Sequence, residues 1–249
     1  MQKLTVLIAL VVTLLTSSAT SFAQGPSREE LLEEIKTKRV ELTALEKSFL
    51  SPAEEDQMLY AEFLRTPNTG LVRLLPREKF DSDVYKENRK SIAMRGGGAF
   101  YSFSRLTHEY GSGNDLALDQ GWFYVGFSGA DYGFMTNVGD LPLELLNLEH
   151  PAVSTFYAYK PAKEEPEARR EYRRFIAGAV LDGLPVKRRS PAQLNSTYLL
   201  RSITYLRSDL LVAFRVVRVD SDGSTTIIWK LLKSYEVPKL NAASPGVLR

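Results

Sequence analysis

The hydrophobic pattern of this chain changes its period near Gly70, from a helical repeat to the alternation that is typical of β-strands. Before this point, apolar residues recur at spacings of four and three between residues 31 and 49. After it, short alternating segments are separated by Gly, Asn and Asp, and a helical pattern returns only near residues 166–180. The order of helices, strands, helix and strands predicts an α+β fold with mostly antiparallel sheets.

Residues 24–66 are predicted to form a helical hairpin. The first helix carries the apolar stripe, which Lys38 interrupts, and a second helix is predicted to begin at Ser51, with Pro52 in its first turn, and to end before Pro67. The stripe has two interpretations. It either packs on the chain's own domain, which we favour because Lys38 weakens a coiled-coil seam, or it assembles with another copy.

Residues 67–240 are predicted to form the α+β domain, with a packing helix near residues 166–180. Its last sheet segment is expected to be an antiparallel meander whose final hairpin turns at residues 220–223, where Asp-Ser-Asp-Gly lies between apolar strands. The strand candidates are 71–75, 99–105, 122–127, 132–136, 198–206, 210–219 and 225–232, and residues 81–90 are expected to hold a helical turn or two. The tail, residues 241–249, has no periodicity and is predicted to be disordered.

Residues 1–23 resemble a secretory signal peptide in their layout. Lys3 precedes an apolar run over residues 4–15, and Ser21 and Ala23 place small residues at the positions that a signal peptidase reads. The run is too short to span a bilayer, which takes about 20 residues, so we expect no integral membrane segment after cleavage. The expected location is therefore periplasmic or extracellular, with a mature chain that begins at Gln24.

Composition excludes several classes of protein. The chain has no cysteine, which removes disulfides, thiolate metal sites, cysteine nucleophiles and a lipid-modified cysteine anchor. The chain has 32 basic and 30 acidic residues, and cleavage after Ala23 removes Lys3, so a mature chain would carry 31 against 30. Such a balanced charge does not favour nucleic acid as a partner, and export argues further against it.

One motif comes close to that of a serine hydrolase. Residues 126–130 read Gly-Phe-Ser-Gly-Ala, one residue away from G-x-S-x-G, and Ser128 is followed by Asp131 or Asp140 and then by His150. A nucleophile elbow needs a helix after the serine, whereas residues 131–134 read as a turn or a strand. A hairpin loop is therefore the favoured interpretation, and no catalytic residue is assigned.

Metal and phosphate motifs are incomplete. His108 and Glu109 begin an H-E-x-x-H motif that lacks its second histidine, and Gly96, Gly97 and Gly98 lack the Lys-Ser/Thr that follows them in a phosphate-binding loop. The Asp-Ser-Asp-Gly segment lacks the remaining ligands of a calcium loop. We expect no metal site and no cofactor.

Two basic clusters are candidates for contact with a polyanion such as a phosphorylated envelope lipid. One lies within residues 169–174 and the other is Lys187-Arg188-Arg189. In the first cluster, glutamates alternate with the arginines at helical spacing, which favours a salt-bridged solvent face instead.

The strongest anomaly is a set of ten aromatic residues within residues 99–134. In a strand, neighbouring side chains point to opposite faces, so Trp122 and Tyr124 share one face and Phe123 takes the other. Two interpretations follow: both faces are core, or one face presents Trp122, Tyr124 and Tyr101 as a platform for a ligand. We favour the core, and keep these three residues as the candidate ligand-binding set.

The function that the sequence favours is that of an exported soluble protein of the envelope or secretome, a non-catalytic binding or interaction module. Its expected partners are a glycan, a peptide or an envelope protein. The alternative is an envelope hydrolase with a site near the loops of residues 111–150, and a third class is structural assembly through the helix at residues 31–49.

Overall fold

The computed structural model describes residues 25–81, 92, 94–108, 110–111, 113–127 and 129–241. The chain divides into two compact units, residues 1–44 and residues 45–249. The predicted signal peptide, the helical turns at residues 82–90 and the tail from residue 242 lie outside the described residues. Among the described residues, no helix is long and apolar enough to cross a membrane.

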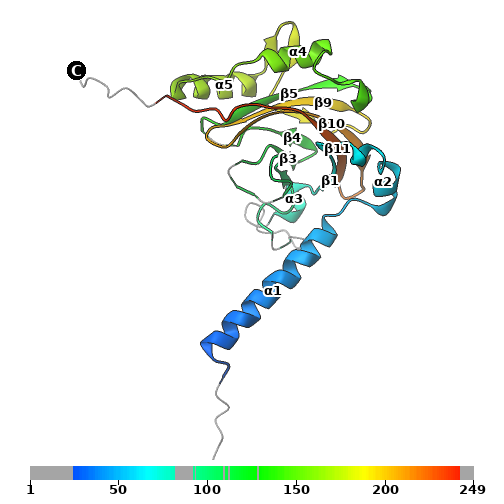
Figure 1. Ribbon diagram of the computed structural model, residues 1–249, viewed down its shortest axis with the longest axis vertical. Coiled ribbons are helices and arrows are strands. Elements are labelled where there is room, and N and C mark those ends of the chain that lie inside the picture. Colours follow the sequence, from blue (N-terminus) through cyan, green and yellow to red (C-terminus); the bar gives the residue numbers. More distant parts are fainter. Residues whose placement is uncertain are drawn as a thin grey trace, which may run out of the picture. The chain divides into compact units, whose positions relative to one another are not determined.

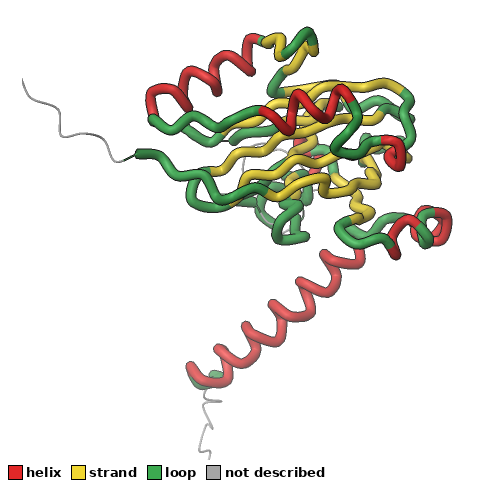
Figure 2. The backbone as a smooth tube through the Cα atoms, turned by 45° about the horizontal axis from the view of Figure 1, so that its top comes forward, coloured by secondary structure: helices red, strands yellow, loops and turns green. Residues whose placement is uncertain are grey.

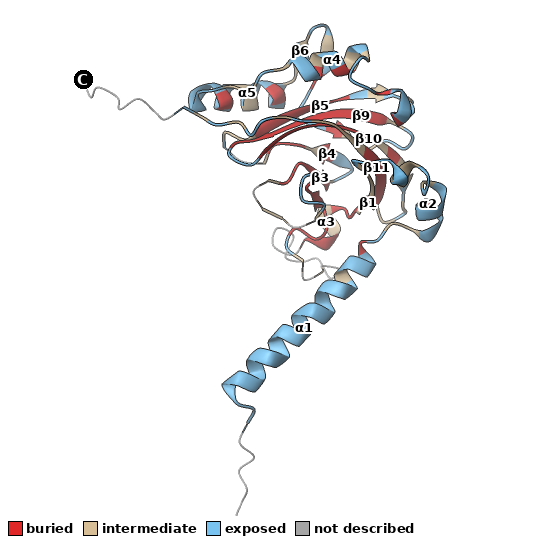
Figure 3. Ribbon diagram, viewed as in Figure 1, coloured by how far each residue is buried: buried red, intermediate tan, exposed pale blue. Residues whose placement is uncertain are grey.

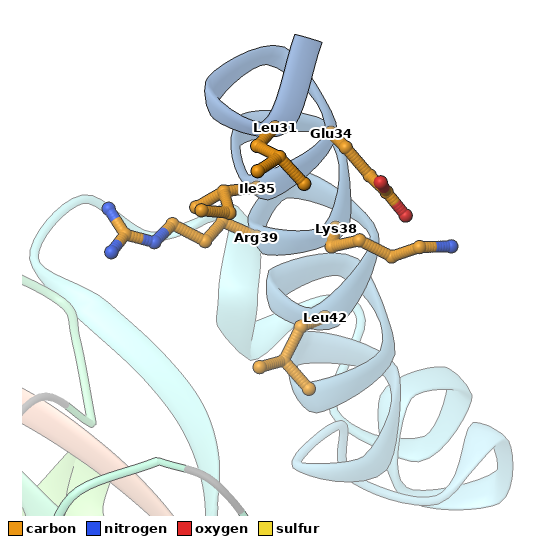
Figure 4. Close-up of a pocket in the computed structure, with 6 residues that line it drawn as sticks. All are labelled: Leu31, Glu34, Ile35, Lys38, Arg39 and Leu42. Atoms are coloured by element: carbon orange, nitrogen blue, oxygen red, sulfur yellow. The ribbon is translucent and has the colours of Figure 1, made fainter. Parts of the chain in front are cut away.

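Helix α1 (Arg28–Phe49) begins with a reciprocal capping box. Ser27 Oγ accepts a hydrogen bond from the backbone N–H of Glu30 at 3.2 Å, and the Glu30 carboxylate accepts one from the N–H of Ser27 at 2.7 Å. The side chains of Leu31, Ile35 and Leu42 lie along one side of the helix (Figure 4) and are exposed. Figure 3 shows most of α1 in the colour of exposed residues. A single helix cannot bury its own stripe, so the partner of this stripe stays a prediction.

The second predicted helix is shorter than expected. It forms α2 (Glu54–Leu59) and a separate 3₁₀ turn, η1 (Phe63–Arg65). The N-cap is Ala53, whose methyl side chain cannot accept a capping hydrogen bond, and the Ser51 hydroxyl donates to the carbonyl of Lys47 at 2.9 Å. The Ser51 cap was therefore a wrong prediction, and the hairpin arrangement of the two helices stays a prediction.

A five-stranded antiparallel sheet forms the centre of the second unit (Figures 1 and 2). Its strand order is β1 (Thr69–Leu74), β11 (Thr225–Ser234), β10 (Ser208–Val219), β9 (Thr197–Thr204) and β5 (Tyr132–Gly139). Strands β9, β10 and β11 are the predicted meander, and residues 220–223 make the predicted hairpin turn, with Gly223 at φ 88°. The Arg73 guanidinium on β1 lies 3.0 Å from the carboxylate of Asp220. This ion pair ties the turn between β10 and β11 to β1, so Asp220 has a structural role.

Gly70 is required by its cross-strand partner. It pairs with Trp229 of β11, and a Cβ added at Gly70 would lie 2.5 Å from the indole ring. The ring therefore covers the glycine and fills the space that a side chain would take.

A smaller antiparallel sheet covers one face of the central sheet. Its strand order is β2 (Phe100–Tyr101), β3 (Leu116–Asp119), β4 (Trp122–Tyr124) and β8 (Arg189–Pro191). The two sheets enclose one hydrophobic core, in which Phe123 makes edge contacts with Tyr198 and Phe214 at ring distances of 5.5 and 5.1 Å. The predicted strand at residues 99–105 shortens to two residues, because the chain turns at Phe103.

Helices cover the other face of the central sheet. Helix α4 (Pro151–Ala158) and helix α5 (Glu165–Ala177) pack on it around Phe134, which stacks on Phe175 at a ring distance of 4.5 Å. Helix α5 confirms the helix predicted near residues 166–180, and it ends at Gly178, whose φ is 98°. The second unit is thus an α+β fold with a helical layer, a central sheet and a smaller sheet (Figure 1).

The remaining elements are short. They are α3 (Arg77–Phe80), η2 (Leu143–Leu145) and a two-stranded ribbon of β6 (Ala179–Leu181) and β7 (Leu184–Val186). The ribbon contributes Val186 to the core beneath the helices.

Candidate functional site

The aromatic window divides between the two faces of the small sheet. The register pairs Phe100 with Ala117 and Ala117 with Tyr124, so Phe100 and Tyr124 lie on one face. Tyr101 and Phe123 lie on the opposite face and belong to the core between the sheets. The face turned away from the central sheet, called the outer face below, therefore carries Trp122 and Tyr124 but not Tyr101.

Two interpretations of the window need correction. Tyr101 is buried, with 6% of its surface exposed, and lies beside Trp229 and Phe103, so it cannot share a platform with Trp122. Burial raises its pKa to about 12. Trp122 is 37% exposed, so the favoured placement of Trp122 in the core was wrong.

Arginines accompany the aromatic rings of the outer face. The guanidinium carbon of Arg189 lies 5.0 Å from the ring centre of Trp122, in the range of a cation–π contact. Arg188 lies 5.9 Å from the ring of Tyr124 and 5.2 Å from the ring of Tyr172 on α5. Neither arginine forms a salt bridge with another described residue. One cation therefore lies beside the exposed ring of Trp122 and a second lies between the half-buried rings of Tyr124 and Tyr172.

Arg188 is fixed in place by the backbone. Its Nε donates hydrogen bonds to the carbonyls of Val125 and Gly126, both at 3.0 Å. Both acceptor carbonyls belong to the residues that come directly after β4. The chain segment that places Tyr124 therefore also positions the guanidinium of Arg188. The arrangement costs little entropy when a ligand binds, because the cation is already ordered.

The other end of the outer face is closed by packing. Phe100 makes edge contacts with Tyr110 and Phe127 at ring distances of 4.5 and 5.4 Å, and Arg77 lies 5.2 Å from the Phe100 ring. Phe100 is buried, whereas Tyr124 is half-buried and packs against this group. The accessible part of the outer face is thus the end that holds Trp122.

A separate cavity of about 380 Å³ lies beside the helical layer. It lies between the α4–α5 connection, strands β9 and β10, and the segment that follows β11. Its lining residues are Tyr159, Lys160, Pro161, Ala162, Lys163, Arg201, Asp209, Tyr235, Glu236, Val237, Pro238 and Lys239.

A buried ion pair forms the base of this cavity. Arg201 is fully buried and donates two hydrogen bonds to the carboxylate of Asp209, at 2.6 and 2.8 Å. Burial raises the pKa of Asp209, against the opposing effect of Arg201. Arg201 also donates to the carbonyl of Phe156 near the C-terminus of α4, at 3.0 Å, where the helix offers acceptors without intrahelical donors.

A second buried carboxylate joins the two sheets. Asp115 is fully buried and accepts hydrogen bonds from Ser202 Oγ at 2.7 Å and from the backbone N–H of Phe103 at 2.8 Å. Burial raises the pKa of Asp115 to about 6, although these hydrogen bonds act in the opposite direction. No sequence motif marked this residue, because its donors are distant in the chain.

The residues of the hydrolase hypothesis have structural partners. The Asp131 carboxylate accepts the N–H of Tyr205 at 2.9 Å, Asp140 pairs with Arg215 at 2.6 Å, and His150 Nδ1 accepts the N–H of Ala152 at the start of α4. Ser128 lies outside the described residues. These contacts give the hydrolase alternative no support.

The other sequence candidates also have structural partners. His108 Nε2 lies 2.8 Å from the carbonyl of Arg73, and burial lowers the pKa of this histidine; Glu109 is outside the described residues. On α5, the predicted salt-bridged face is confirmed by pairs such as Arg169 with Glu165 at 2.6 Å. Within the described part of the chain, no group of three or more His, Cys, Asp or Glu side chains is arranged to hold a metal ion.

The chain was compared with protein families, curated proteins and solved structures, and no relative was found. No protein-family model, no curated protein and no solved structure matches the chain.

Proposed function

We propose that this protein is an exported, non-catalytic binding module that binds an acidic glycan through Trp122, Tyr124, Arg188 and Arg189. The observation that carries the proposal is the exposed ring of Trp122 with the Arg189 guanidinium 5.0 Å from its centre. Tyr101, the third candidate of the sequence, is left out because it is buried on the opposite face.

The chemistry of an acidic glycan suits both kinds of side chain. The C–H groups of a sugar ring carry partial positive charge and pack on the negative face of an aromatic ring. A guanidinium binds a carboxylate through two parallel hydrogen bonds. Rings and guanidinium groups that alternate over a short distance therefore match a chain of sugars in which each unit carries a carboxylate.

Nucleic acid is the less favoured polyanion. Bases also stack on aromatic rings, and arginines contact phosphates. The chain, however, has 32 basic and 30 acidic residues, without the basic excess that drives such binding. The proposed export also separates the protein from intracellular nucleic acid.

Trp122→Ala is expected to remove glycan binding while leaving the fold intact. Because Trp122 is 37% exposed, more than half of its surface is buried, and the free energy of unfolding should fall by about 2 to 3 kcal/mol, less than for a Trp in the core. The affinity for hexagalacturonate should fall at least about tenfold, since a central aromatic contact is lost. Calorimetric titration and thermal unfolding measure the two effects.

Matched controls separate the contributions of ring and charge. Tyr157→Ala removes another exposed aromatic ring, 42% exposed on α4, and should leave binding unchanged. Arg189→Gln should weaken binding of hexagalacturonate but not the residual binding of its methyl ester. If Trp122→Ala binds hexagalacturonate like the wild type, the proposal is wrong; if a thymidine oligonucleotide binds more tightly than the glycan, the nucleic-acid alternative replaces it.

Export predicts a defined processing event. When the full chain is expressed in a bacterium, the released protein should have the intact mass of a chain that begins at Gln24. Val11→Arg, which places a charge within the apolar run, should leave the protein uncleaved. Release of a chain that still carries Met1, or unchanged processing of Val11→Arg, would contradict export by this segment.

A further inference from the structure

The cavity at the buried Arg201–Asp209 pair has the features of a second, independent binding site. Its volume of about 380 Å³ lies within the range of small-molecule sites. Tyrosine, proline, alanine and valine side chains supply most of its apolar wall. It is formed by residues that lie on the helical side of the central sheet, whereas Trp122 lies on the outer face of the small sheet.

The wall of the cavity is fixed by backbone hydrogen bonds. The segment after β11, residues 235–241, is drawn at the red end of the chain in Figure 1. Tyr235 donates its N–H to the carbonyl of Asp209 at 2.9 Å, and Asn241 donates its N–H to the carbonyl of Lys163 at 2.8 Å. Between them, the carbonyl of Pro238 accepts the N–H of Leu206 at 2.9 Å. The cavity is therefore preformed, which lowers the entropic cost of binding.

Tyr235 connects the wall to the base. Its ring centre lies 3.4 Å from the guanidinium carbon of Arg201, and its hydroxyl donates to the carbonyl of Tyr157 at 3.2 Å. Because Arg201 neutralises Asp209, the buried pair leaves no net charge at the base. The sign of the net charge around the cavity is consequently set by the residues at its rim.

The rim is cationic. Lys160, Lys163 and Lys239 are exposed around the cavity, and Glu236 is the single acidic residue of the lining besides Asp209. Three exposed ammonium groups and one carboxylate attract an anion, and the apolar wall suits a flat hydrocarbon body. We propose that the cavity binds a small organic anion, an aromatic carboxylate in chemical class.

The test uses 2-naphthoate and its uncharged analogue 2-naphthamide as probes, titrated into the full chain by calorimetry. Naphthoate should bind at least about tenfold more tightly than naphthamide, because only the carboxylate carries a negative charge that the lysines attract. The triple variant Lys160→Gln, Lys163→Gln, Lys239→Gln should remove this difference. These lysines are exposed, so the variant should unfold at the temperature of the wild type.

Two further variants locate the site. Lys36→Gln, Lys38→Gln, Lys47→Gln changes the net charge equally on α1 and should bind naphthoate like the wild type. Val237→Trp, at an exposed lining position, should block both probes while preserving thermal stability. Equal affinity for naphthoate and naphthamide, or unchanged naphthoate binding in Val237→Trp, would overturn the proposal. Hexagalacturonate binding should be unaffected by Val237→Trp, which keeps this test separate from that of the outer face.

Discussion

Arg201→Met is expected to lower the free energy of unfolding by about 3 to 5 kcal/mol, because it leaves the carboxylate of Asp209 buried without its counter-ion. Asp209 is 2% exposed and has both oxygens bound to the guanidinium. The variant also removes the donor to the carbonyl of Phe156 and the cation on which Tyr235 stacks. Urea unfolding followed by tryptophan fluorescence measures the change.

A double variant separates the effect of removing both charges of the pair from the effect of leaving one charge buried alone. Arg201→Met combined with Asp209→Val removes both charges, and should recover all but about 1 kcal/mol, the cost of the lost hydrogen bond to Phe156. Arg169→Met, which breaks the exposed pair with Glu165, serves as the control and should change stability by less than about 1 kcal/mol. An Arg201→Met protein as stable as this control would show that the buried pair is not needed for stability.

Asp115→Asn is expected to change how stability depends on pH. Burial raises the pKa of Asp115 from 3.8 to about 6, so the folded protein takes up a proton more readily than the unfolded chain. The wild type therefore gains stability as the pH falls from 6 toward 3.8, and loses it again as the pH rises through 6. Relative to Asp115→Asn, this gain should be about 2.4 kcal/mol at pH 4 and approach about 3 kcal/mol well below pH 3.8, at 1.36 kcal/mol for each pKa unit.

The asparagine can keep the hydrogen bonds that the carboxylate makes. Its carbonyl oxygen can accept from the N–H of Phe103, and its amide can donate to Ser202 Oγ. The difference between variant and wild type is the quantity to measure, because burial lowers the pKa of His108 and gives the wild type an opposite pH dependence. Asp182→Asn, in the exposed turn between β6 and β7, is the control. Parallel profiles for wild type and Asp115→Asn from pH 4 to 7 would contradict the prediction.

The parts of the fold that were predicted are those with long, regular patterns. The meander of β9, β10 and β11 was predicted because its strands run for eight residues or more and meet at an Asp-Gly turn. In the small sheet, β4 lies within the strand predicted at residues 122–127, whereas β8 was missed because its three residues are too few to establish a period. Helix α4 was missed because its eight residues place only Val153 and Phe156 in the core.

The candidate site was predicted only in part. Strand alternation correctly placed Trp122 and Tyr124 on one face. Tyr101 was assigned to the same face without knowledge of how its strand pairs, and its pairing with Leu116 turns the Tyr101 side chain toward the core. Whether a face is covered depends on the rest of the fold, so the exposure of Trp122 could not be read from its neighbours in sequence. The cavity has no sequence motif, because its lysines come from segments that are about 80 residues apart in the chain.

The register of the central sheet also constrains the order in which the chain can fold. Strand β1 pairs with β11, joining Gly70 to Trp229, so the first strand to be synthesised finds its only partner in the sheet in the last one. Until β11 has been made, β1 and β10 each present an unpaired edge, and the segment that closes the cavity does not yet exist. A ribosome-bound chain therefore cannot complete this sheet until β11 has been made, and the export proposed above would benefit from this delay.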